Sequence, residues 1–553
     1  LAVVPLAFLG LFFIYPVVGM LARGFVVEGH FNPGAVLEVL GRGRTHQVLW
    51  FTLWSSGVAT LGAVVLGVPI AYALHALDFR GRGLLQVAIV VPFVLPTVVV
   101  GVAFRQLFAA GGWLEGLGLD GSSGAIIAAL VFFNLSVVVR TVGAMWGSLD
   151  VRREQAALVL GATPAQVFRT VTLPALRPAI LAAGSVVFLF CATAFGVVLT
   201  LGGLKQANIE TEIWLLTAHQ LDLTAAAALS VLQVLVIVGL LVATKSLERR
   251  SSGGTGRRVL VKPSRAHVPV LIWTGIVVLL LALPMVSLLV RSLQYDAHWS
   301  LHNYAALAGH DEPSALQALS NSLQIASVAA LIALVLGVLV AWLISGSAGL
   351  ATRAFEGAFM LPLGVSAVTV GFGFLITLGR PPLTLLSWPW LVPIAQATVA
   401  LPLVVRTVAP MLKSIDDRQR QVAASLGASP WRVALTVDLP LIWRSLLAAA
   451  GFAFAVSLGE FGATSFLARE EVPTLPVMIY RLIGHPGQAN AGTAMAASVV
   501  LAALTALAWV ARSYDLVPLA ALMVAGFAVA NAVLGIRLAL ALMREEPPGE
   551  ARP

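Results

Sequence analysis

The stretch QAALVLGATPAQVFRTVTLP, from Gln155 to Pro174, occurs a second time as QVAASLGASPWRVALTVDLP, from Gln421 to Pro440. Eleven of the twenty positions are identical at a constant offset of 266 residues, far more than chance gives in an apolar chain. Both copies are polar interruptions between long apolar runs. The pattern therefore predicts two equivalent loops outside a lipid bilayer, and their near-identity indicates a shared role.

The composition places the rest of the chain in a membrane. Of 553 residues, 59% are hydrophobic and 11% are charged, and the mean hydropathy is +0.94, whereas soluble proteins carry about 25% charged residues. Apolar stretches of about 20 residues recur, which is the length a helix needs to cross the hydrocarbon core. Because the backbone must satisfy its own hydrogen bonds there, the spans are helices, and the pattern is not the short alternation of a β-barrel. The predicted fold class is all-α, a polytopic helical membrane protein.

Twelve apolar runs are predicted to span the bilayer. Six lie in the first half, at roughly 2–22, 48–77, 84–108, 124–146, 178–200 and 223–244. Six lie in the second half, at roughly 268–290, 321–345, 355–378, 391–412, 444–466 and 491–511. The run Leu516–Met543 could add a thirteenth, which would carry the acidic tail Glu545–Pro553 outside. Leu1–Leu21 is too long and uninterrupted for a cleaved signal, and we expect a short leader before Leu1.

Lysine and arginine decide the predicted orientation, because basic loops stay in the cytoplasm. If the spans alternate, one side collects most of the basic residues between spans, namely Arg80, Arg82, Arg152, Arg153, Arg169, Arg177, the seven in the linker Lys245–Arg265, Lys413, Arg418, Arg420, Arg432 and Arg444. Arg42 and Arg44 fall on the outer side and are the clearest exceptions. The net charge of +9 therefore reflects membrane topology and not nucleic-acid binding.

The duplication extends beyond the two loops. LGVPIAYAL at Leu66 resembles LGVLVAWLI at Leu336, and Arg140-Thr141-Val142 matches Arg406-Thr407-Val408. Since both repeated loops lie on the basic side, the halves share one orientation and form a parallel repeat. The predicted organisation is a first repeat of six helices at 1–244, a basic cytoplasmic linker at 245–267, a second repeat of six helices at 268–511, and an extra segment at 512–553.

Each repeated loop is predicted to be two short helices joined by a glycine turn. In the first copy Gly161 supplies the backbone freedom for a sharp turn, and Pro164 suits the first turn of the next helix. The second copy repeats both features at Gly427 and Pro430. The Leu-Pro pair that closes each copy is predicted to start the re-entry into the membrane. A small apolar-faced helix in the cytosol is predicted to dock into a groove on another protein; the alternative is a helix lying on the lipid surface.

The two loops resemble the signature of the permease subunits of binding-protein-dependent ATP-binding cassette importers, in which EAA, three residues and a glycine are followed further on by an apolar residue, leucine and proline. The resemblance covers both halves, about residues 1–511. It implies that each loop is a coupling helix inserted into a separate ATPase subunit. The positions carried over are Gln155, Ala156, Ala157, Leu160, Gly161, Ala162, Pro164, Gln421, Val422, Ala423, Leu426, Gly427, Ala428 and Pro430. Because glutamine stands where the family has glutamate, no salt bridge from that position is carried over.

Two further segments resemble the iron(III) and thiamine group of these permeases. They are FGVVLTLGGLKQANIETEIW, which begins at Phe195, and SLGEFGATSFLAREEVPTLPVMIYRLIG, which begins at Ser457. The second contains Glu460-Phe461-Gly462 and Thr474-Leu475-Pro476, the pattern that closes the second half of thiamine permeases. The resemblance implies a small cationic solute as cargo, with thiamine ahead of iron(III).

Three ionisable residues are candidates for the translocation pathway. Glu460 lies in an otherwise apolar run, and an ionisable group at membrane depth costs about 2.5–3.5 kcal/mol on insertion scales, so it normally faces a cavity or a partner. A carboxylate there suits a cationic cargo; the alternative is a structural ion pair with Arg140 or Arg406. These two arginines recur near the cytoplasmic ends of their spans. Two interpretations remain open for them: side chains that extend to the lipid–water interface, or a role in gating.

The sequence contains no G-x-x-x-x-G-K-[ST] motif, so the chain is not predicted to be an enzyme that hydrolyses ATP. The resemblance implies two separate ATPase subunits that hold ATP and Mg²⁺, and an extracytoplasmic solute-binding protein. No catalytic residue, resident cofactor or metal site is predicted, since the histidines show no HExxH spacing and Cys191 is the only cysteine. The hypothesis is a multi-pass permease of the bacterial cytoplasmic membrane. The rival is an ion-gradient-driven secondary transporter, which would not need two matching loops; a membrane-embedded enzyme would need a convergent catalytic set.

Overall fold

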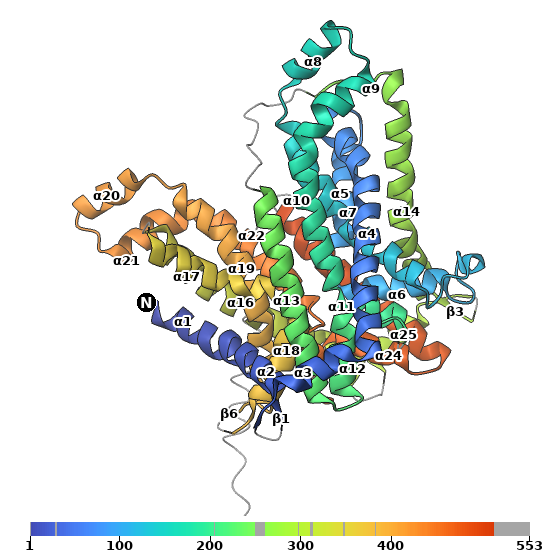
Figure 1. Ribbon diagram of the computed structural model, residues 1–553, viewed down its shortest axis with the longest axis vertical. Helices are drawn as coiled ribbons and strands as arrows, with labels where there is room; N and C mark the ends of the chain where they lie inside the picture. The colour runs from blue at the N-terminus through green and yellow to red at the C-terminus, as the bar shows by residue number, and fades with distance from the viewer. Residues whose placement is uncertain are drawn as a thin grey trace, which may run out of the picture.

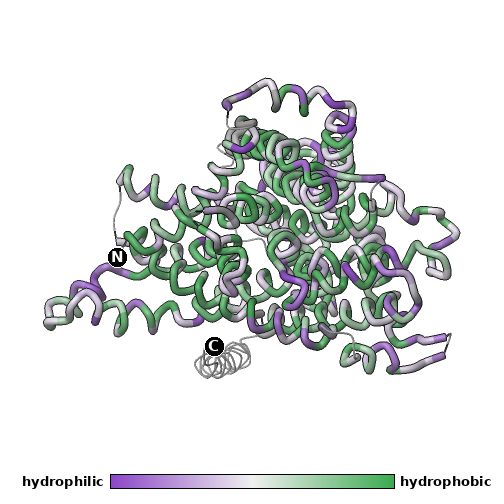
Figure 2. Tube along the Cα trace, turned by 90° about the horizontal axis from the view of Figure 1, so that it is seen from below, coloured by the Kyte–Doolittle hydropathy of each residue, from purple (hydrophilic) through white to green (hydrophobic). Residues whose placement is uncertain are grey.

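The structure, a computed structural model, describes residues 2–27, 30–203, 205–248, 260–296, 298–309, 313–346, 349–381 and 383–513. Within these ranges the chain is almost entirely helical (Figure 1). Apolar residues run along the helices, and hydrophilic residues gather in the connecting loops (Figure 2). The prediction of an all-α polytopic membrane fold is confirmed. The proposed thirteenth span, 516–543, lies outside the described residues.

Ten runs of described residues are long and apolar enough to cross a bilayer. In the first half they are α1 (Val3–Leu9) continuing into α2 (Tyr15–Phe25), α4 (Gly43–Ala76), α7 (Ser123–Gly147), α9 (Pro164–Val167) continuing into α10 (Leu173–Ala192), and α13 (Leu223–Glu248). In the second half they are α14 (Val268–Ser292), α16 (Ala315–Ser345), α19 (Leu391–Lys413), α21 (Pro430–Val433) continuing into α22 (Leu439–Leu458), and α25 (Gln488–Ser513). The three joints are π-helical, at Gly10–Ile14, Phe168–Thr172 and Ala434–Asp438.

Two predicted spans are not straight helices. In place of 84–108, α5 (Arg82–Val94) and α6 (Thr97–Phe108) meet at 102°. In place of 355–378, α17 (Leu350–Met360), extended by a 3₁₀ turn to residue 364, meets α18 (Ala367–Thr377) at 95°. Pro96 forces extended backbone on the residue before it, which breaks the first pair. The Ser366 hydroxyl caps α18 by accepting a hydrogen bond from the Thr369 backbone N–H at 3.0 Å, which fixes the second break.

The predicted spans 178–200 and 444–466 are wrong at both ends. The observed helices begin earlier, at α9 and α21, and end at Ala192 and Leu458. The apolar residues that follow form short helices that do not cross the bilayer as single spans, namely α11 (Phe195–Gly202), α12 (Ile209–Ala218), α23 (Thr464–Leu467) and α24 (Leu475–Gly484). Because α11 is as apolar as the span before it, hydropathy alone does not show where that span ends.

The remaining elements are short and lie mostly between spans. The helices are α3 (Pro33–Gly41), α8 (Val151–Val159), α15 (His302–Ala305) and α20 (Asp417–Ser425), with 3₁₀ turns at Glu115–Leu117, Arg265–His267, Ala306–Ala308 and Leu361–Gly364. The antiparallel hairpins are β1 (Val26–Val27) with β2 (His30–Phe31), β3 (Gln294–Tyr295) with β4 (His298–Trp299), and β5 (Gly379–Arg380) with β6 (Leu383–Thr384).

The first span of each half packs on the other half as well as on its own. The helix α2 packs on α18, where the Gly19 and Gly373 positions lie against Thr377 and Pro16 respectively. In the same way α14, the first span of the second half, packs on α4 and α6. The two contacts, α2 with α18 and α14 with α6, are equivalent under the sequence repeat. They also tie the halves together along their length.

The two halves meet at one end and diverge at the other. Figure 1 places α8 and α9 at the top and α20 and α21 at the left, well apart from each other. By contrast, α18 of the second half packs on both α2 and α12 of the first, and α24 packs on α6. Because α8 and α20 belong to the basic, cytoplasmic side, the outer ends of the halves are closed together and the cytosolic ends are separated.

The two outer arginines that break the basic-side pattern are both paired with carboxylates. Arg44 Nη2 lies 2.7 Å from Glu212 Oε2, and the Glu212 side chain is only 5% exposed. Arg42 Nη1 lies 3.3 Å from Asp222 Oδ2 in a pair that is exposed on both sides. Each of the two exceptions therefore has its charge balanced by a carboxylate from the same half.

Replacing Arg44 by alanine is expected to lower the free energy of unfolding by about 1–3 kcal/mol, because it leaves the buried Glu212 carboxylate without its partner. The Arg42→Ala variant is the matched control, and its exposed pair contributes less than about 1 kcal/mol. Thermal unfolding of the purified variants measures both effects. Equal shifts in the two variants would contradict this account of Glu212.

Candidate functional site

The two repeated loops begin with the same helix cap. The Asp150 carboxylate accepts a hydrogen bond from the Arg152 N–H at 3.0 Å at the start of α8. At the start of α20 the Asp416 carboxylate accepts one from the Arg418 N–H at 2.9 Å. Aspartate is favoured at this position because it satisfies a free backbone donor and interacts well with the helix dipole. Both short helices therefore begin by the same physical device.

The glycine turn is also the same in both copies. Gly161 has φ +88° and Gly427 has φ +84°, a left-handed conformation that side chains disfavour. The glycine N–H donates to the carbonyl three residues back at 3.0 Å in each copy, and the next alanine N–H donates to the carbonyl five residues back at 3.1 Å. This pairing is the Schellman motif that ends helices at glycine. The predicted role of the glycines as turn residues is thus explained by their geometry.

The second short helix of each loop starts at a proline. Thr163 and Ser429 precede the two prolines, and their hydroxyls accept backbone N–H groups at 3.3 and 3.4 Å. From that point the chain is helical through a π-helical turn into the span, so the Leu-Pro pair does not start the re-entry as predicted. Each loop is therefore joined rigidly to a membrane helix.

Apolar side chains at the tip of each loop face solvent. Leu160 is 87% exposed and Leu426 is 83% exposed, and Trp431 in the second loop is 67% exposed. The fourteen carried-over positions are all exposed or half-buried, namely Gln155, Ala156, Ala157, Leu160, Gly161, Ala162, Pro164, Gln421, Val422, Ala423, Leu426, Gly427, Ala428 and Pro430. Neither α8 nor α20 has a buried residue. Exposed apolar clusters of this kind are typical of protein-binding surfaces.

The two loops differ in how they are anchored to their spans. In the first loop the Thr172 hydroxyl donates to Glu154 Oε1 at 2.9 Å. At the equivalent positions of the second loop, Arg420 Nε donates to Asp438 Oδ1 at 2.8 Å. Although partial burial lowers the pKa of Arg420, hydrogen bonds and charge from Asp438 and Asp417 outweigh it, so that pKa is raised. A neutral donor anchors one loop and an ion pair anchors the other. Sequence analysis missed these two anchoring pairs. A comparison of Glu154 with Arg420 and of Thr172 with Asp438, at the repeat offset, would have shown them.

The Thr172→Asp variant is expected to lower uptake several-fold, because it sets a carboxylate against Glu154 within hydrogen-bonding distance. Adding Glu154→Arg should restore uptake, since the pair then reproduces the arrangement of the second loop. A double-mutant cycle of uptake rates measures the coupling between the two positions. If the double variant is no better than Thr172→Asp alone, the anchoring role is wrong.

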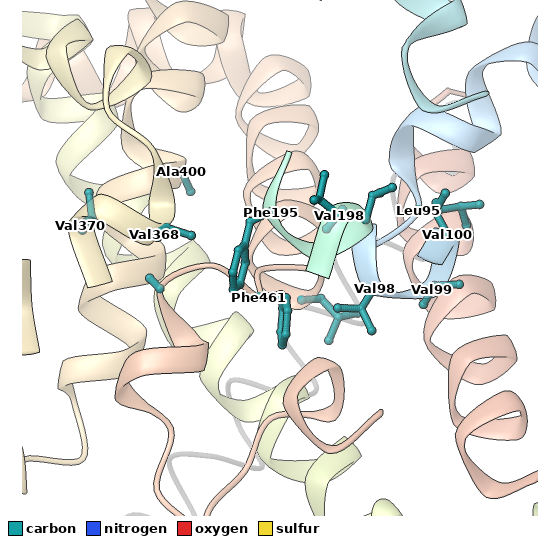
Figure 3. Packing of buried hydrophobic residues seen from close by; sticks show 14 of the residues in the cluster. Leu95, Val98, Val99, Val100, Phe195, Val198, Val368, Val370, Ala400 and Phe461 are labelled. Carbon is teal, nitrogen blue, oxygen red and sulfur yellow. The ribbon is translucent and has the colours of Figure 1, made fainter. Parts of the chain in front are cut away.

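At the outer end, equivalent residues of the two halves contact each other. Phe195 and Phe461, which correspond under the repeat, stack with ring centroids 5.3 Å apart and an interplanar angle of 21° (Figure 3). Trp214 of the first half makes an edge contact with Tyr480 of the second at 5.7 Å. A side chain at Gly459 would meet the Pro96 ring at 3.2 Å, which shows how closely the halves approach. We call Phe195, Trp214, Phe461 and Tyr480 the aromatic gate.

The three predicted pathway residues do not come together. Glu460 is buried beside the aromatic gate, where its carboxylate accepts backbone N–H groups of Ala463 at 2.7 Å and Thr464 at 3.0 Å. In the described structure the Glu460 carboxylate is therefore fixed by these two hydrogen bonds, and not by the ion pair with Arg140 or Arg406 that was the alternative. Arg140 and Arg406 are exposed, each seven residues before the cytoplasmic end of its helix. A role in the pathway stays a prediction for all three.

Comparison with known proteins shows which family and which proteins the chain is similar to. Residues 63–252 match the family described as the binding-protein-dependent transport system inner membrane component. The chain is 28% identical over 473 residues to the thiamine transport system permease protein ThiP of Escherichia coli K12, covering 81% of this chain and 86% of that protein. It is 27% identical over 523 residues to the protein of the same name from Brucella abortus strain 2308, covering 89% and 94%. It is also similar to a probable ABC transporter permease protein, y4fN, of Sinorhizobium fredii, at 25% identity over 80% of this chain and 83% of that protein.

The family match falls on the first half and includes its repeated loop, while the similarity to the relatives extends over most of both halves. The polytopic helical fold agrees with a protein that works within a membrane. The chain therefore contains, at residues 63–252, a domain of the binding-protein-dependent transport system inner membrane component family, a family of transport permeases, and its apolar helices are those of a multi-pass protein of the bacterial inner membrane.

Proposed function

We propose that this permease imports thiamine, driven by two ATPase subunits that dock on its two cytosolic loops. The observation that carries the docking role is the pair of exposed apolar tips around Leu160 and Leu426, presented by matching caps and Schellman turns. The apolar surface of each tip is exposed to water, which is unfavourable, until a partner covers it. Two equivalent tips suit two copies of one partner. ATP and Mg²⁺ would be held by those subunits.

The relatives support thiamine as the cargo. Those from Escherichia coli and Brucella abortus carry the name thiamine transport system permease protein, and their similarity covers more than four fifths of this chain. The residues that carried the resemblance in the second half, Glu460-Phe461-Gly462, form part of the closed outer junction in the structure. An external solute-binding protein would deliver the cargo at that junction.

The arrangement of the two halves suggests how docking would drive transport. Each loop continues without a break into a membrane helix, so a force on α8 or α20 moves α10 or α22 directly. The described state is closed at the outer end. When ATP binds, the two docked subunits would draw the loops together and open the aromatic gate to the exterior. A ligand shifts such an equilibrium only if it prefers one state, and here ATP would prefer the state with the loops close together.

The cargo is tested by uptake into proteoliposomes that contain the permease, its ATPase subunits and enclosed ATP, with the solute-binding protein outside. Saturable accumulation of labelled thiamine that chelated iron(III) does not inhibit is the expected result. Uptake of iron(III) in place of thiamine would overturn the cargo assignment. Uptake of either solute driven by an ion gradient without the ATPase subunits would support a secondary transporter instead.

A further inference from the structure

Glu210 on α12 is a fully buried carboxylate that lies outside the set of pathway residues predicted from sequence. Its side chain is 0% exposed. Gln233 Nε2 donates a hydrogen bond to Oε1 at 2.9 Å, and the Ser366 hydroxyl donates one to Oε2 at 2.7 Å. Within the described part of the chain no Lys, Arg or His forms an ion pair with it. A buried carboxylate held only by neutral donors is unusual enough to require an explanation.

Two neighbouring carboxylates have the structural partners that Glu210 lacks. Glu212, two residues along the same helix, is paired with Arg44. Glu460 accepts two backbone N–H groups inside its own loop, so it acts as a local cap. The chain thus provides a cation or a cap for each of these carboxylates, and only an amide and a hydroxyl for Glu210. A purely structural role accounts well for Glu212 and Glu460 but not for Glu210.

Glu210 lies on the contact between the two halves. Glu210 and Gln233 belong to the first half, whereas Ser366 is the cap of α18 in the second. Val368, two residues beyond Ser366, belongs to the apolar cluster that also contains Phe195 and Phe461 (Figure 3). Separation of the outer ends would break the bond from Ser366 and leave the carboxylate facing the opened passage.

The surroundings of Glu210 suit an organic cation. Trp214 lies one helical turn further along α12 and therefore on the same face, and it belongs to the aromatic gate. Two buried polar atoms on the residues that surround it, Trp214 Nε1 and Gln233 Oε1, have no hydrogen-bond partner among the described residues. Ring faces attract cations, and a carboxylate supplies the opposite charge. Once the halves separate, the site offers one negative charge, ring faces, one free donor and one free acceptor.

We propose that Glu210 binds the positive charge of a small heteroaromatic cation as it passes the opened outer gate, an inference that rests on the proposed import of such a solute. In the closed state Ser366 takes the place of the cargo at the carboxylate. Cargo binding and gate closure therefore compete for the same oxygen atom. This assigns charge recognition to α12, in the segment between the span helices.

The test compares Glu210→Gln with Glu210→Asp in the full complex in proteoliposomes, with thiamine as the probe. Gln has the shape of Glu and keeps an oxygen for hydrogen bonding but has no charge, whereas Asp keeps the charge on a shorter side chain. If charge matters, Glu210→Gln lowers thiamine uptake at least tenfold and Glu210→Asp retains more uptake than Glu210→Gln. If Glu210 only joins the halves by hydrogen bonds, the order is reversed, which would overturn the proposal.

The Glu460→Gln and Glu460→Asp pair serves as the matched control, since that carboxylate is held by backbone donors, and it is expected to show no advantage for Asp over Gln. Co-purification of the ATPase subunits confirms that each variant is assembled. Wild-type uptake separates the two proposals. If wild type fails to import thiamine, the cargo assignment and this inference both fall, whereas normal wild-type uptake with an unaffected Glu210→Gln variant overturns this inference alone.

Discussion

Replacing both Leu160 and Leu426 by aspartate is expected to abolish ATP-driven uptake and to prevent the ATPase subunits from co-purifying. Both side chains are more than four fifths exposed, so the substitutions should change the stability of the permease by less than about 0.5 kcal/mol. In a docked complex, however, they would place a charge in each apolar contact. Fully buried unpaired charges in interfaces cost several kcal/mol, and each 1.4 kcal/mol is a tenfold loss of affinity.

Co-purification with tagged ATPase subunits and uptake in proteoliposomes measure the effect. The matched control is Leu117→Asp, a leucine that is 60% exposed in the outer loop at Glu115–Leu117, which should leave both readouts unchanged. Each single variant should retain part of the binding, because the other loop is intact. A double variant that still binds and transports at the wild-type level would show that the loops are not the docking site.

The second large effect is expected when Phe195 and Phe461 are both replaced by alanine, which should shift the permease toward the state that is open to the exterior. Both rings are almost completely buried in the closed state, and buried Phe→Ala substitutions cost about 3–5 kcal/mol each. In this case the packing energy that is lost belongs to the contact between the two halves, which exists only in the closed state. A shift of even 1.4 kcal/mol changes the ratio of closed to open states tenfold.

Labelling with a membrane-impermeant maleimide detects this shift. The probe is Thr97→Cys, beside Gly196 in the gate region, in a Cys191→Ala background that removes the single native thiol. The rate of labelling from outside should rise at least tenfold in the double alanine variant. Phe132→Ala is the control, because that buried ring contacts Phe104 within the first half. If Phe132→Ala raises labelling as much, the aromatic gate does not hold the halves together.

The sequence predicts the cytosolic loops well because their structure is local. The Schellman turn needs only a glycine at the right distance from a helix start, and the caps need only Asp150 and Asp416. The repeat doubles this signal, so chance matches are easily excluded. The loop residues are exposed as expected from two polar interruptions in an apolar chain.

The closed outer end could not be predicted in the same way. The breaks near Pro96 and Ser366 lie inside continuous apolar runs, where hydropathy gives no sign that a span bends. The packing of α2 and α14 on the other half depends on contacts between residues hundreds of positions apart. Periodicity within one helix carries no information about which neighbour it meets.

The choice between carboxylates shows the same limit. Glu460 stands out in sequence because its neighbours are apolar, yet the structure gives it two backbone donors. Glu210 stands in the polar stretch Asn208–Glu212, where nothing in the sequence separates it from Glu212. Its complete burial and its bond to Ser366 of the other half appear only after folding. Ionisable residues in a membrane protein therefore have to be weighed by their partners as well as by the hydropathy of their neighbours.

The central claim is that separate ATPase subunits drive transport by acting on two cytosolic loops. The most direct test measures thiamine uptake into proteoliposomes that enclose ATP, with the permease reconstituted alone, with wild-type ATPase subunits, or with subunits unable to hydrolyse ATP. Uptake only with the hydrolysing subunits, and its loss when the loop tips are changed, is the predicted result. Uptake at the full rate by the permease alone would contradict the account.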